Sequence, residues 1–209
     1  IDSGRLGKFL LAGCQMRWFR EQDYYDSGLW RGTWALDGGG CLMNQGIHSV
    51  DLLIYLVGTP VSVCAFQGPV THERIEVEDN LGALVRFENG AVGTIEASTS
   101  CPPGFARRIE ISGDRGSIAI EGDRIVRWCF SEPQPEDQEM IASEDGDVGG
   151  AADPTAIDVS GHRAVVEDFV ASWQSGQKLA IDGCEGIKSV EFICAAYESI
   201  RTGGPVDLI

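Results

Sequence analysis

A short glycine-rich segment followed by an amide and an imidazole is the part of this sequence best suited to chemistry. It runs from Gly38-Gly39-Gly40 through Asn44 to His48. Glycines at the start of a helix let a backbone or a ligand approach closely, and the free amides there favour an anionic group. Asn44 and His48 are four residues apart and therefore project from the same side of a helix. Because imidazole exchanges a proton near neutral pH, His48 is the candidate proton-transfer residue.

The residues from Leu42 to Val57 have the periodicity of an amphipathic helix. At about 100° per residue, the apolar side chains fall within a sector of roughly 80°; they are Leu42, Val50, Leu53 and Val57. The opposite side carries a specific polar set rather than Lys and Glu, namely Asn44, His48, Asp51 and Tyr55. Gly58 and Pro60 end the helix. Two interpretations stay open: a reactive face, or a polar face that only meets solvent and carries His48 incidentally.

A strand and an aromatic loop precede the helix. From Lys8 to Phe19 alternate residues are apolar on one side, whereas the other side is mixed and includes Arg17. This is the pattern of a strand with one face in the core. The loop that follows ends at the three glycines and is rich in aromatic and cationic side chains: Arg20, Tyr24, Tyr25, Trp30, Arg31 and Trp34.

Between Pro60 and Phe130 the periodicity changes to two, which is typical of strands. The predicted strands are 61–70, 81–88, 91–98, 107–112, 117–121 and 124–130. Asn89-Gly90 is a strong hairpin signal, and residues 113–116 form a second turn. Several alternate positions on one face are polar: Arg86, Glu88, Thr94 and Glu96. We therefore expect one side of the sheet to lack a cover from the chain's own helices.

The C-terminal third predicts an acidic loop and two helices. Residues 131–159 contain nine acidic residues and no Lys or Arg, the composition of a solvated loop. The helix at 162–174 has an apolar stripe of Val166, Val170 and Trp173. The helix at 182–201 opens with a capping-box-like Asp182-x-x-Glu185, and its predicted inward residues are Ile187, Val190, Cys194 and Tyr197.

The order of these elements predicts an α+β fold: an open, mostly antiparallel sheet with helices packed on one face. A doubly wound parallel sheet is disfavoured, because helices do not separate the strands. Gly38-Gly39-Gly40 lacks the spacing of a dinucleotide fingerprint, and no GxGxxG follows a predicted strand, so a Rossmann domain is absent. We see no repeat and no domain boundary, and expect residues 1–209 to form a single domain with the acidic loop at 131–159.

Composition excludes several classes of protein. The chain has 209 residues, 43% of them hydrophobic and 23% charged, which suits one sizeable core. Its net charge is −16, so nucleic acid and anionic membranes are poor partners. No apolar run reaches the ~20 residues needed to span a bilayer, and no signal peptide is visible at the start.

The cysteines and histidines predict no metal site and no disulfide framework. The seven cysteines are widely spaced and form no CxxC motif, so we expect reduced thiols and a cytoplasmic location. The histidines are far apart in sequence, and no HExxH motif is present. We expect His72 to lie on the surface at a strand end and His162 to cap a helix.

Several motifs together resemble one known family. The chain resembles the C-terminal domain of the glucose–fructose oxidoreductase / inositol dehydrogenase (Gfo/Idh/MocA) family in Trp30-Arg31-Gly32-Thr33-Trp34, Gly38-Gly39-Gly40, Asn44-Gln45-Gly46-Ile47-His48 and Asp51-Leu52-Leu53. Weaker similarity covers nearly all of the remaining chain, in residues 4–8, 89–91, 199–203 and 205–206. The string of three glycines followed by Asn-Gln-Gly-Ile-His is the most specific part.

The resemblance implies an NAD(P)-dependent oxidoreductase acting on a sugar, nucleotide sugar or cyclitol. In that family an N-terminal Rossmann domain binds NAD or NADP and supplies the lysine of a Glu-Lys-Pro motif; neither is present in this sequence. The chain would then be the substrate-binding and oligomerisation half. The family's histidine sits beside the reacting hydroxyl, which makes His48 the implied catalytic residue. The position four residues earlier is often Asp but is Asn44 here, so a charged pair is lost.

Within this resemblance the aromatic loop supplies candidates for substrate binding. Trp30, Trp34 and Tyr25 are the candidates to stack on a sugar face, and Arg31 or Arg20 to bind a carboxylate or phosphate; the alternative is that these side chains only pack the loop onto the sheet. Arg17 is either a substrate ligand or an interface residue. Asp51 could hold one ring nitrogen of His48 and so select its tautomer.

Three further expectations follow from the resemblance. The chain alone should not bind NAD(H) and should be inactive. It should form a homodimer or homotetramer through the uncovered face of the sheet. The alternative function is a non-catalytic relative that uses the same fold for ligand sensing or protein interaction.

Overall fold

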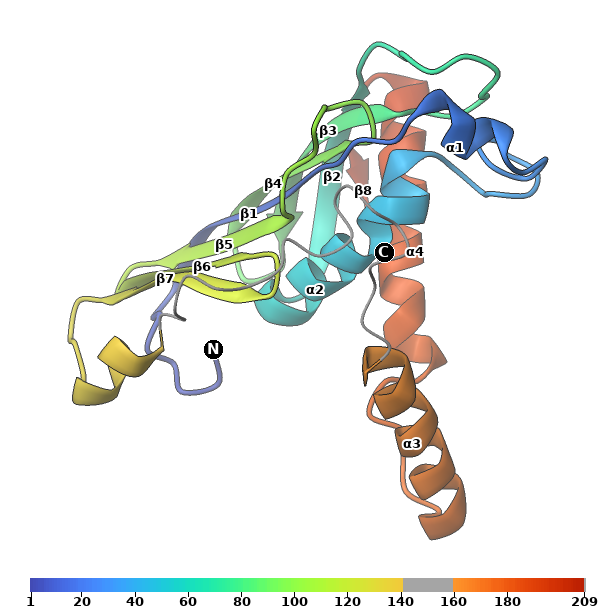
Figure 1. The fold of residues 1–209 in the computed structure, drawn as a ribbon. Coiled ribbons are helices and arrows are strands. Elements are labelled where there is room, and N and C mark those ends of the chain that lie inside the picture. Colours follow the sequence, from blue (N-terminus) through green and yellow to red (C-terminus); the bar gives the residue numbers. More distant parts are fainter. Residues whose placement is uncertain (141–159, 209) are drawn as a thin grey trace.

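A computed structural model of the chain describes residues 1–140 and 160–208. Its centre is an eight-stranded sheet with the order β7-β6-β5-β1-β4-β3-β2-β8 (Figure 1). The strands are β1 (Phe9–Arg17), β2 (Pro60–Gln67), β3 (Asn80–Phe87), β4 (Val92–Ser98), β5 (Arg108–Gly113), β6 (Gly116–Glu121), β7 (Arg124–Phe130) and β8 (Val206–Asp207). The helices are α1 (Gln22–Asp26), a π-helical turn (Leu42–Gly46), α2 (Ile47–Val57), a 3₁₀ turn (Pro135–Glu139), α3 (Ser160–Ser175) and α4 (Gly183–Thr202).

The sheet is open and almost entirely antiparallel, as predicted. Of its neighbouring pairs only β1 and β4 run parallel, in a register that pairs Leu11 with Val92 and Arg17 with Ser98. Both predicted hairpins form, β3–β4 around Asn89-Gly90 and β5–β6 around the 113–116 turn. The insertion of β1 between β4 and β5 joins these two hairpins into one sheet.

Helices α2 and α4 lie on the same side of the sheet (Figure 1). The apolar side chains predicted for the first helix, Leu42, Val50, Leu53 and Val57, are all buried. They belong to the same core as the inward residues of β1, which include Cys14 and Met16. At about 25 cal/mol per Å² of apolar surface, this burial is the main stabilising term for the pairing of helix and sheet. Within residues 1–140 and 160–208, no helix covers the other side of the sheet (Figure 1).

The predicted inward face of the last helix is wrong at three of its four residues; the fourth, Tyr197, is partly buried against the core, as predicted. Ile187 and Val190 are 51% and 38% exposed, and Cys194 is also exposed. The residues that α4 buries are Ser189, Phe192, Ile193, Ala196 and Ser199. Ser199 is small enough to let the helix approach β2 closely, and its Oγ accepts a hydrogen bond from the Ala65 amide at 2.9 Å.

The predicted stripe of the preceding helix is exposed. In α3 the exposed fractions of Val166, Val170 and Trp173 are 61%, 45% and 82%. The helix projects beyond the N-terminal end of α4 and away from the sheet (Figure 1). Its periodicity therefore predicted the helix correctly, but not what the apolar stripe packs against.

Only the first part of the predicted acidic loop, residues 131–140, lies within the described residues. There Asp137 receives two 2.7 Å bonds from Arg5 and one from Trp128 Nε1 at 2.8 Å. The hydrogen bond from Arg5 and that from the Gln134 amide hold the pKa of the Asp137 carboxyl far below its ordinary value. Among the described residues, no helix combines the length and hydrophobicity needed to cross a bilayer.

Candidate functional site

His48 is an exposed residue in the first turn of α2. Its ring makes no hydrogen bond with the part of the chain that the structure describes. Asp51, which could have held a ring nitrogen, instead accepts a 2.6 Å hydrogen bond from Ser189 of α4. The imidazole is therefore available to a molecule approaching from outside, and Asp51 ties α2 to α4.

Asn44 lies in the π-helical turn, one turn before His48. Its Nδ2 donates a 2.6 Å hydrogen bond to Asp37 of the preceding loop. Its Oδ1 accepts no hydrogen bond from the described residues, so that oxygen remains able to accept one from a hydroxyl group. Asp37 also accepts a 2.9 Å hydrogen bond from the Gly32 amide, which ties Asn44 to the aromatic loop.

The anionic group expected at the start of the helix is a side chain of the protein itself. Glu78 Oε2 accepts a 3.0 Å hydrogen bond from the Gly40 amide, and Oε1 accepts from the Leu42 amide at 3.0 Å and the Tyr197 hydroxyl at 3.0 Å. Burial raises the pKa of the Glu78 carboxyl above its ordinary value, and these hydrogen bonds only partly oppose that effect. The free amides of the helix are thereby satisfied internally.

Gly40 makes this approach possible. A Cβ at this position would lie 1.7 Å from the backbone oxygen of Glu78, an impossible contact. The same oxygen accepts a 2.8 Å hydrogen bond from the Cys41 amide. The glycines predicted that a backbone or a ligand approaches the start of the helix closely. In the structure the backbone of Glu78 makes that approach.

Tyr24 connects the aromatic loop with the turn that carries Asn44. Its hydroxyl accepts a 3.1 Å hydrogen bond from Gln45 Nε2, and the guanidinium of Arg31 lies 4.5 Å from the centre of its ring. Arg31 also lies 4.7 Å from the centre of the Trp30 ring. Trp30 itself is 42% exposed, so this stack offers an aromatic surface to solvent beside a cation.

Arg31 is held by neutral groups alone. Its Nη1 donates to Ser27 Oγ at 2.5 Å and to the Tyr24 carbonyl at 3.4 Å, and its Nε is buried without a partner. It is only partly exposed, yet it forms no ion pair with a described carboxylate in a chain whose net charge is −16. A guanidinium in this state can bind an added carboxylate or phosphate.

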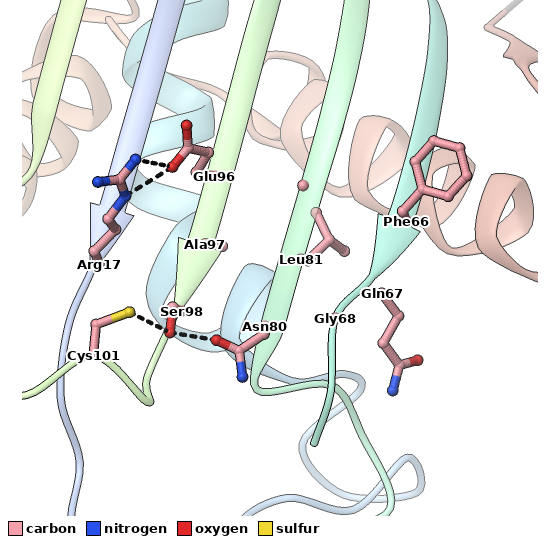
Figure 2. Close-up of a pocket in the computed structure, with 11 residues that line it drawn as sticks. Arg17, Phe66, Gln67, Gly68, Asn80, Leu81, Glu96, Ala97, Ser98 and Cys101 are labelled. Atoms are coloured by element: carbon pink, nitrogen blue, oxygen red, sulfur yellow. Dashed lines mark hydrogen bonds and ion pairs between the residues drawn. The ribbon is translucent and has the colours of Figure 1, made fainter. Parts of the chain in front are cut away.

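Arg17 lies apart from this group, on the open face of the sheet. Its Nε donates to Glu96 Oε2 at 2.7 Å, and both side chains are more than 40% exposed. Figure 2 shows this pair at one side of a shallow groove of about 370 Å³, with the helices behind the strands. Phe66 and Asn80 line the same groove. The structure thus brings together Trp30, Arg31 and the turn that precedes His48, but not Arg17.

The sequence analysis did not predict the buried pair of His72 and Asp79, which lies beside Arg20 at the start of the aromatic loop. The Asp79 side chain is 0% exposed and the His72 side chain 7%, with 2.7 Å between Nδ1 and Oδ2, so the prediction of a surface His72 is wrong. Burial raises the pKa of Asp79, but hydrogen bonds from Thr71 and His72 outweigh it and lower the pKa to about 2. The one signal in the sequence is a pair of acids, Glu78-Asp79, directly before an apolar strand.

Neither a metal site nor a dinucleotide site is present in the described residues. No group of three or more His, Cys, Asp or Glu side chains there could hold a metal ion. The single parallel strand pair has no crossover helix of the dinucleotide type, and the amides of Gly40 and Leu42, which could have bound a phosphate, donate to Glu78 instead. The residues present therefore do not fit a nicotinamide dinucleotide.

Comparison with solved structures finds close matches over the whole chain. The WlbA dehydrogenase from Bordetella pertussis, solved in complex with NADH and UDP-GlcNAcA, is 32% identical with a TM-score of 0.84, over 100% of this chain and 58% of that one. Levoglucosan dehydrogenase in complex with NADH shares the fold, with 22% identity and a TM-score of 0.76 over 100% of this chain and 60% of that one.

Characterised relatives include enzymes of cyclitol oxidation. Inositol 2-dehydrogenase of Rhizobium meliloti is 25% identical over 96% of this chain and 57% of its own length. The scyllo-inositol 2-dehydrogenase (NAD(+)) of Bacillus subtilis is 28% identical over 57% of this chain and 34% of its own length. The chain thus spans only part of the length of the relatives it matches. The family model of the GFO/IDH/MocA C-terminal domain matches residues 1–119, and the chain therefore belongs to the Gfo/Idh/MocA family.

Proposed function

We propose that this chain is the substrate-binding and oligomerisation domain of an NAD(P)-dependent oxidoreductase that acts on a sugar, nucleotide sugar or cyclitol. The observation that carries the proposal is the exposed His48 one turn after Asn44, on a helix whose start is held by the buried Glu78. The dehydrogenases among its relatives support the same reaction class.

His48 would accept the proton of the substrate hydroxyl that is oxidised. Its ring is exposed and has no described hydrogen-bond partner to compete with the substrate, so a ring nitrogen is free to accept that proton as a general base. Asn44 cannot exchange a proton in the working range. Its amide group is held by Asp37, so its remaining oxygen would orient a hydroxyl.

Trp30 and Arg31 would bind the part of the substrate remote from the reacting carbon. Trp30 offers a partly exposed ring for stacking, and Arg31 offers a guanidinium without an ion pair. An anionic substrate fits this pair better than a neutral polyol. The 32% identical WlbA dehydrogenase, which was solved with UDP-GlcNAcA, supports a nucleotide sugar as the first substrate to test.

The nicotinamide cofactor would be held by a separate N-terminal domain. The sequence carries no dinucleotide fingerprint, so this chain would supply the groups that bind the substrate and move its proton. We expect the 209-residue chain alone to be inactive and to show no binding of NADH in calorimetric titration. Micromolar binding to this chain alone would contradict that assignment.

The open face of the sheet would mediate self-association. Besides the Arg17–Glu96 pair, it carries exposed apolar side chains, among them Leu11, Phe66 and Leu84, which are 61%, 66% and 56% exposed. This placement favours Arg17 as an interface residue rather than a substrate ligand. A stable interface would bury more than about 1,000 Å². Light scattering of the full-length protein should show a dimer or tetramer in the cytoplasmic pH range.

The experiment that tests the function is a spectrophotometric assay of the full-length protein for reduction of NAD⁺ and NADP⁺. UDP-N-acetylglucosaminuronic acid, UDP-N-acetylglucosamine and myo-inositol should be compared at equal concentration. We expect the highest kcat/KM with the uronate. A non-catalytic sensor, the alternative function, predicts binding of a sugar ligand without any reduction of cofactor, and it also predicts no GxGxxG and no Glu-Lys-Pro in the sequence upstream.

A further inference from the structure

Two segments far apart in sequence run side by side at the edge of the candidate site. Residues 71–79 follow β2, and residues 20–37 form the aromatic loop. Gln22 exchanges hydrogen bonds of 2.8 and 2.9 Å with the backbone of Glu73. The Glu76 amide donates to the Gly32 carbonyl at 2.7 Å. The segment after β2 thus supports the loop that carries Trp30 and Arg31.

Most of these contacts are exposed to solvent, which limits what each contributes. In the ion pair between Arg74 and Asp26 the two side chains are 58% and 38% exposed, and exposed pairs of this kind stabilise little. The pair between His72 and Asp79 is different, because its side chains are only 7% and 0% exposed. It is therefore the contact whose loss should disturb the loop most.

The His72 ring lies between two hydrogen-bond acceptors. Nδ1 is 2.7 Å from Asp79 Oδ2, and Nε2 is 2.8 Å from the backbone oxygen of Arg20. A carbonyl oxygen can only accept, so Nε2 must carry a hydrogen. Asp79 has a depressed pKa and is an acceptor at neutral pH, so Nδ1 must also carry one. Both bonds exist together only in the doubly protonated ring.

The other groups around His72 are consistent with this state. The Tyr25 ring packs on the imidazole with 4.6 Å between ring centres, and burial raises the pKa of the Tyr25 phenol well above its ordinary value, so the phenol stays neutral. The Tyr25 hydroxyl is paired with Thr99 Oγ1 at 2.8 Å. The Arg20 guanidinium donates to the Phe19 carbonyl at 2.9 Å. The Asp79 carboxylate is thus the charge in direct contact with His72.

We propose that His72 is a positioning residue: as an imidazolium it joins Asp79 to the Arg20 carbonyl and so holds the aromatic loop in the geometry that binds the substrate. Arg20 opens the loop, and the stack of Tyr24, Arg31 and Trp30 follows within eleven residues. His72 itself does not touch the substrate in this arrangement. The statement about substrate rests on the proposed function, whereas the statement about the loop does not.

Two substitutions separate the hydrogen bonds from the packing. His72→Phe keeps a ring against Tyr25 but removes both donors, and His72→Gln keeps one donor and cannot titrate. His162→Phe is the matched control, because His162 is an exposed histidine of α3. Hydrogen exchange of the full-length protein, read by mass spectrometry on peptides covering residues 18–37 and 108–130, measures the loop against a distant part of the sheet.

We expect His72→Phe to speed exchange in residues 18–37 by about tenfold, the usual consequence of losing a hydrogen bond to a charged group, with residues 108–130 unchanged. His72→Gln, which keeps one donor, should speed exchange in the same residues by a smaller factor, and His162→Phe should leave it at the wild-type rate. Loop exchange that is unchanged in both His72 variants would overturn the proposal.

Kinetics of the full-length enzyme with UDP-N-acetylglucosaminuronic acid provide the second readout. We expect KM to rise about tenfold in His72→Phe while kcat stays within about threefold, because the loop binds but does not react. A fall in kcat at unchanged KM would overturn the positioning role. Faster hydrogen exchange of the loop together with an unchanged KM would instead support the role of His72 in holding the loop, and would contradict the substrate site proposed on the loop.

Discussion

Glu78 and Asp79 are consecutive residues with buried carboxyl groups, yet they lie in opposite environments. Glu78 points to the helix side, where it receives the amides of Gly40 and Leu42, and burial raises its pKa. Asp79 points to the loop side, where Thr71, His72 and Ser100 all donate to one of its oxygens. There the donors outweigh burial and lower the pKa to about 2.

The difference shows how one short segment positions both walls of the candidate site. On the Glu78 side the partners are backbone amides and the Tyr197 hydroxyl, which hold the helix that carries Asn44 and His48. On the Asp79 side the partners include an imidazole, which holds the aromatic loop. We call the contacts of Glu78 with the start of the helix the helix anchor, and the contacts of Asp79 and His72 with the aromatic loop the loop anchor. The helix anchor depends on close packing and the loop anchor on charge, so each can be broken without the other.

The largest effect is expected from Gly40→Ala, which breaks the helix anchor by packing alone. The added Cβ would lie 1.7 Å from the backbone oxygen of Glu78, so backbone must move, and we expect a loss of about 4 kcal/mol in the free energy of unfolding. Thermal unfolding should shift down by about 8–16 °C. Gly82→Ala in β3 is the control, since its Cβ would meet nothing within 4 Å. A Gly40 variant as stable as that control would show that the close approach is not needed.

Asp79→Asn should break the loop anchor at a cost of about 3 kcal/mol at neutral pH, because it leaves the imidazolium of His72 without its buried partner. The pKa of Asp79 is lowered on folding, so its contribution is present above the ordinary carboxyl pKa of 3.8 and is lost as pH falls toward about 2. Urea unfolding at pH 6 and pH 3 should therefore show a smaller difference between wild type and variant at pH 3. The control is Asp123→Asn, because the Asp123 side chain is 80% exposed and pairs with Arg107 on the surface. This substitution should change the free energy of unfolding by less than about 0.5 kcal/mol at both pH 6 and pH 3. An equal loss at pH 6 and pH 3 would contradict the ionised state of Asp79.

Glu78→Gln should be the mildest of the three, at about 1–2 kcal/mol, because the amide oxygen can still accept from Leu42 and Tyr197. The pKa of Glu78 is raised on folding above its ordinary value of 4.5, so the folded state binds the proton more tightly. The contribution of Glu78 to the stability of the wild type therefore falls as the pH rises from the pKa of Glu78 in the unfolded chain through its higher pKa in the folded protein. Unfolding curves between pH 4 and 7 should show this loss in the wild type and not in the variant. The exposed Glu88→Gln should keep the wild-type profile, and a Glu78 variant that also keeps it would show that the carboxyl is not perturbed.

The local parts of the fold could be predicted from the sequence. Asn89-Gly90 predicted a hairpin because two-residue turns need positive φ, and Gly90 has a φ of 87°. The apolar sector of the first helix predicted its buried face because the helical period alone decides which residues share a side. Such signals lie within a few residues of one another.

The parts that depend on distant contacts could not be predicted. The parallel pairing of β1 with β4 joins residues about eighty positions apart, and no local pattern specifies it. The buried face of α4 was missed because Ser189 and Ser199 are polar in sequence but small enough to be buried, Ser189 against α2 and Ser199 against β2. His72 was taken for a surface residue because its partners, Asp79 and the Arg20 carbonyl, come from separate segments. Asn44 and His48 were paired from helical spacing alone; the structure places Asn44 in the π-helical turn and His48 in α2, and the roles of both residues stay predictions.

The central claim is that His48 moves the substrate proton in a sugar or nucleotide-sugar dehydrogenase. The most direct measurement is kcat of the full-length His48→Ala variant across the pH range, with His162→Ala as the control. The account predicts a fall in kcat of about 10²–10⁴, the usual effect of losing a general acid or base, while the control keeps wild-type activity. Full activity of the His48 variant at every pH would contradict it.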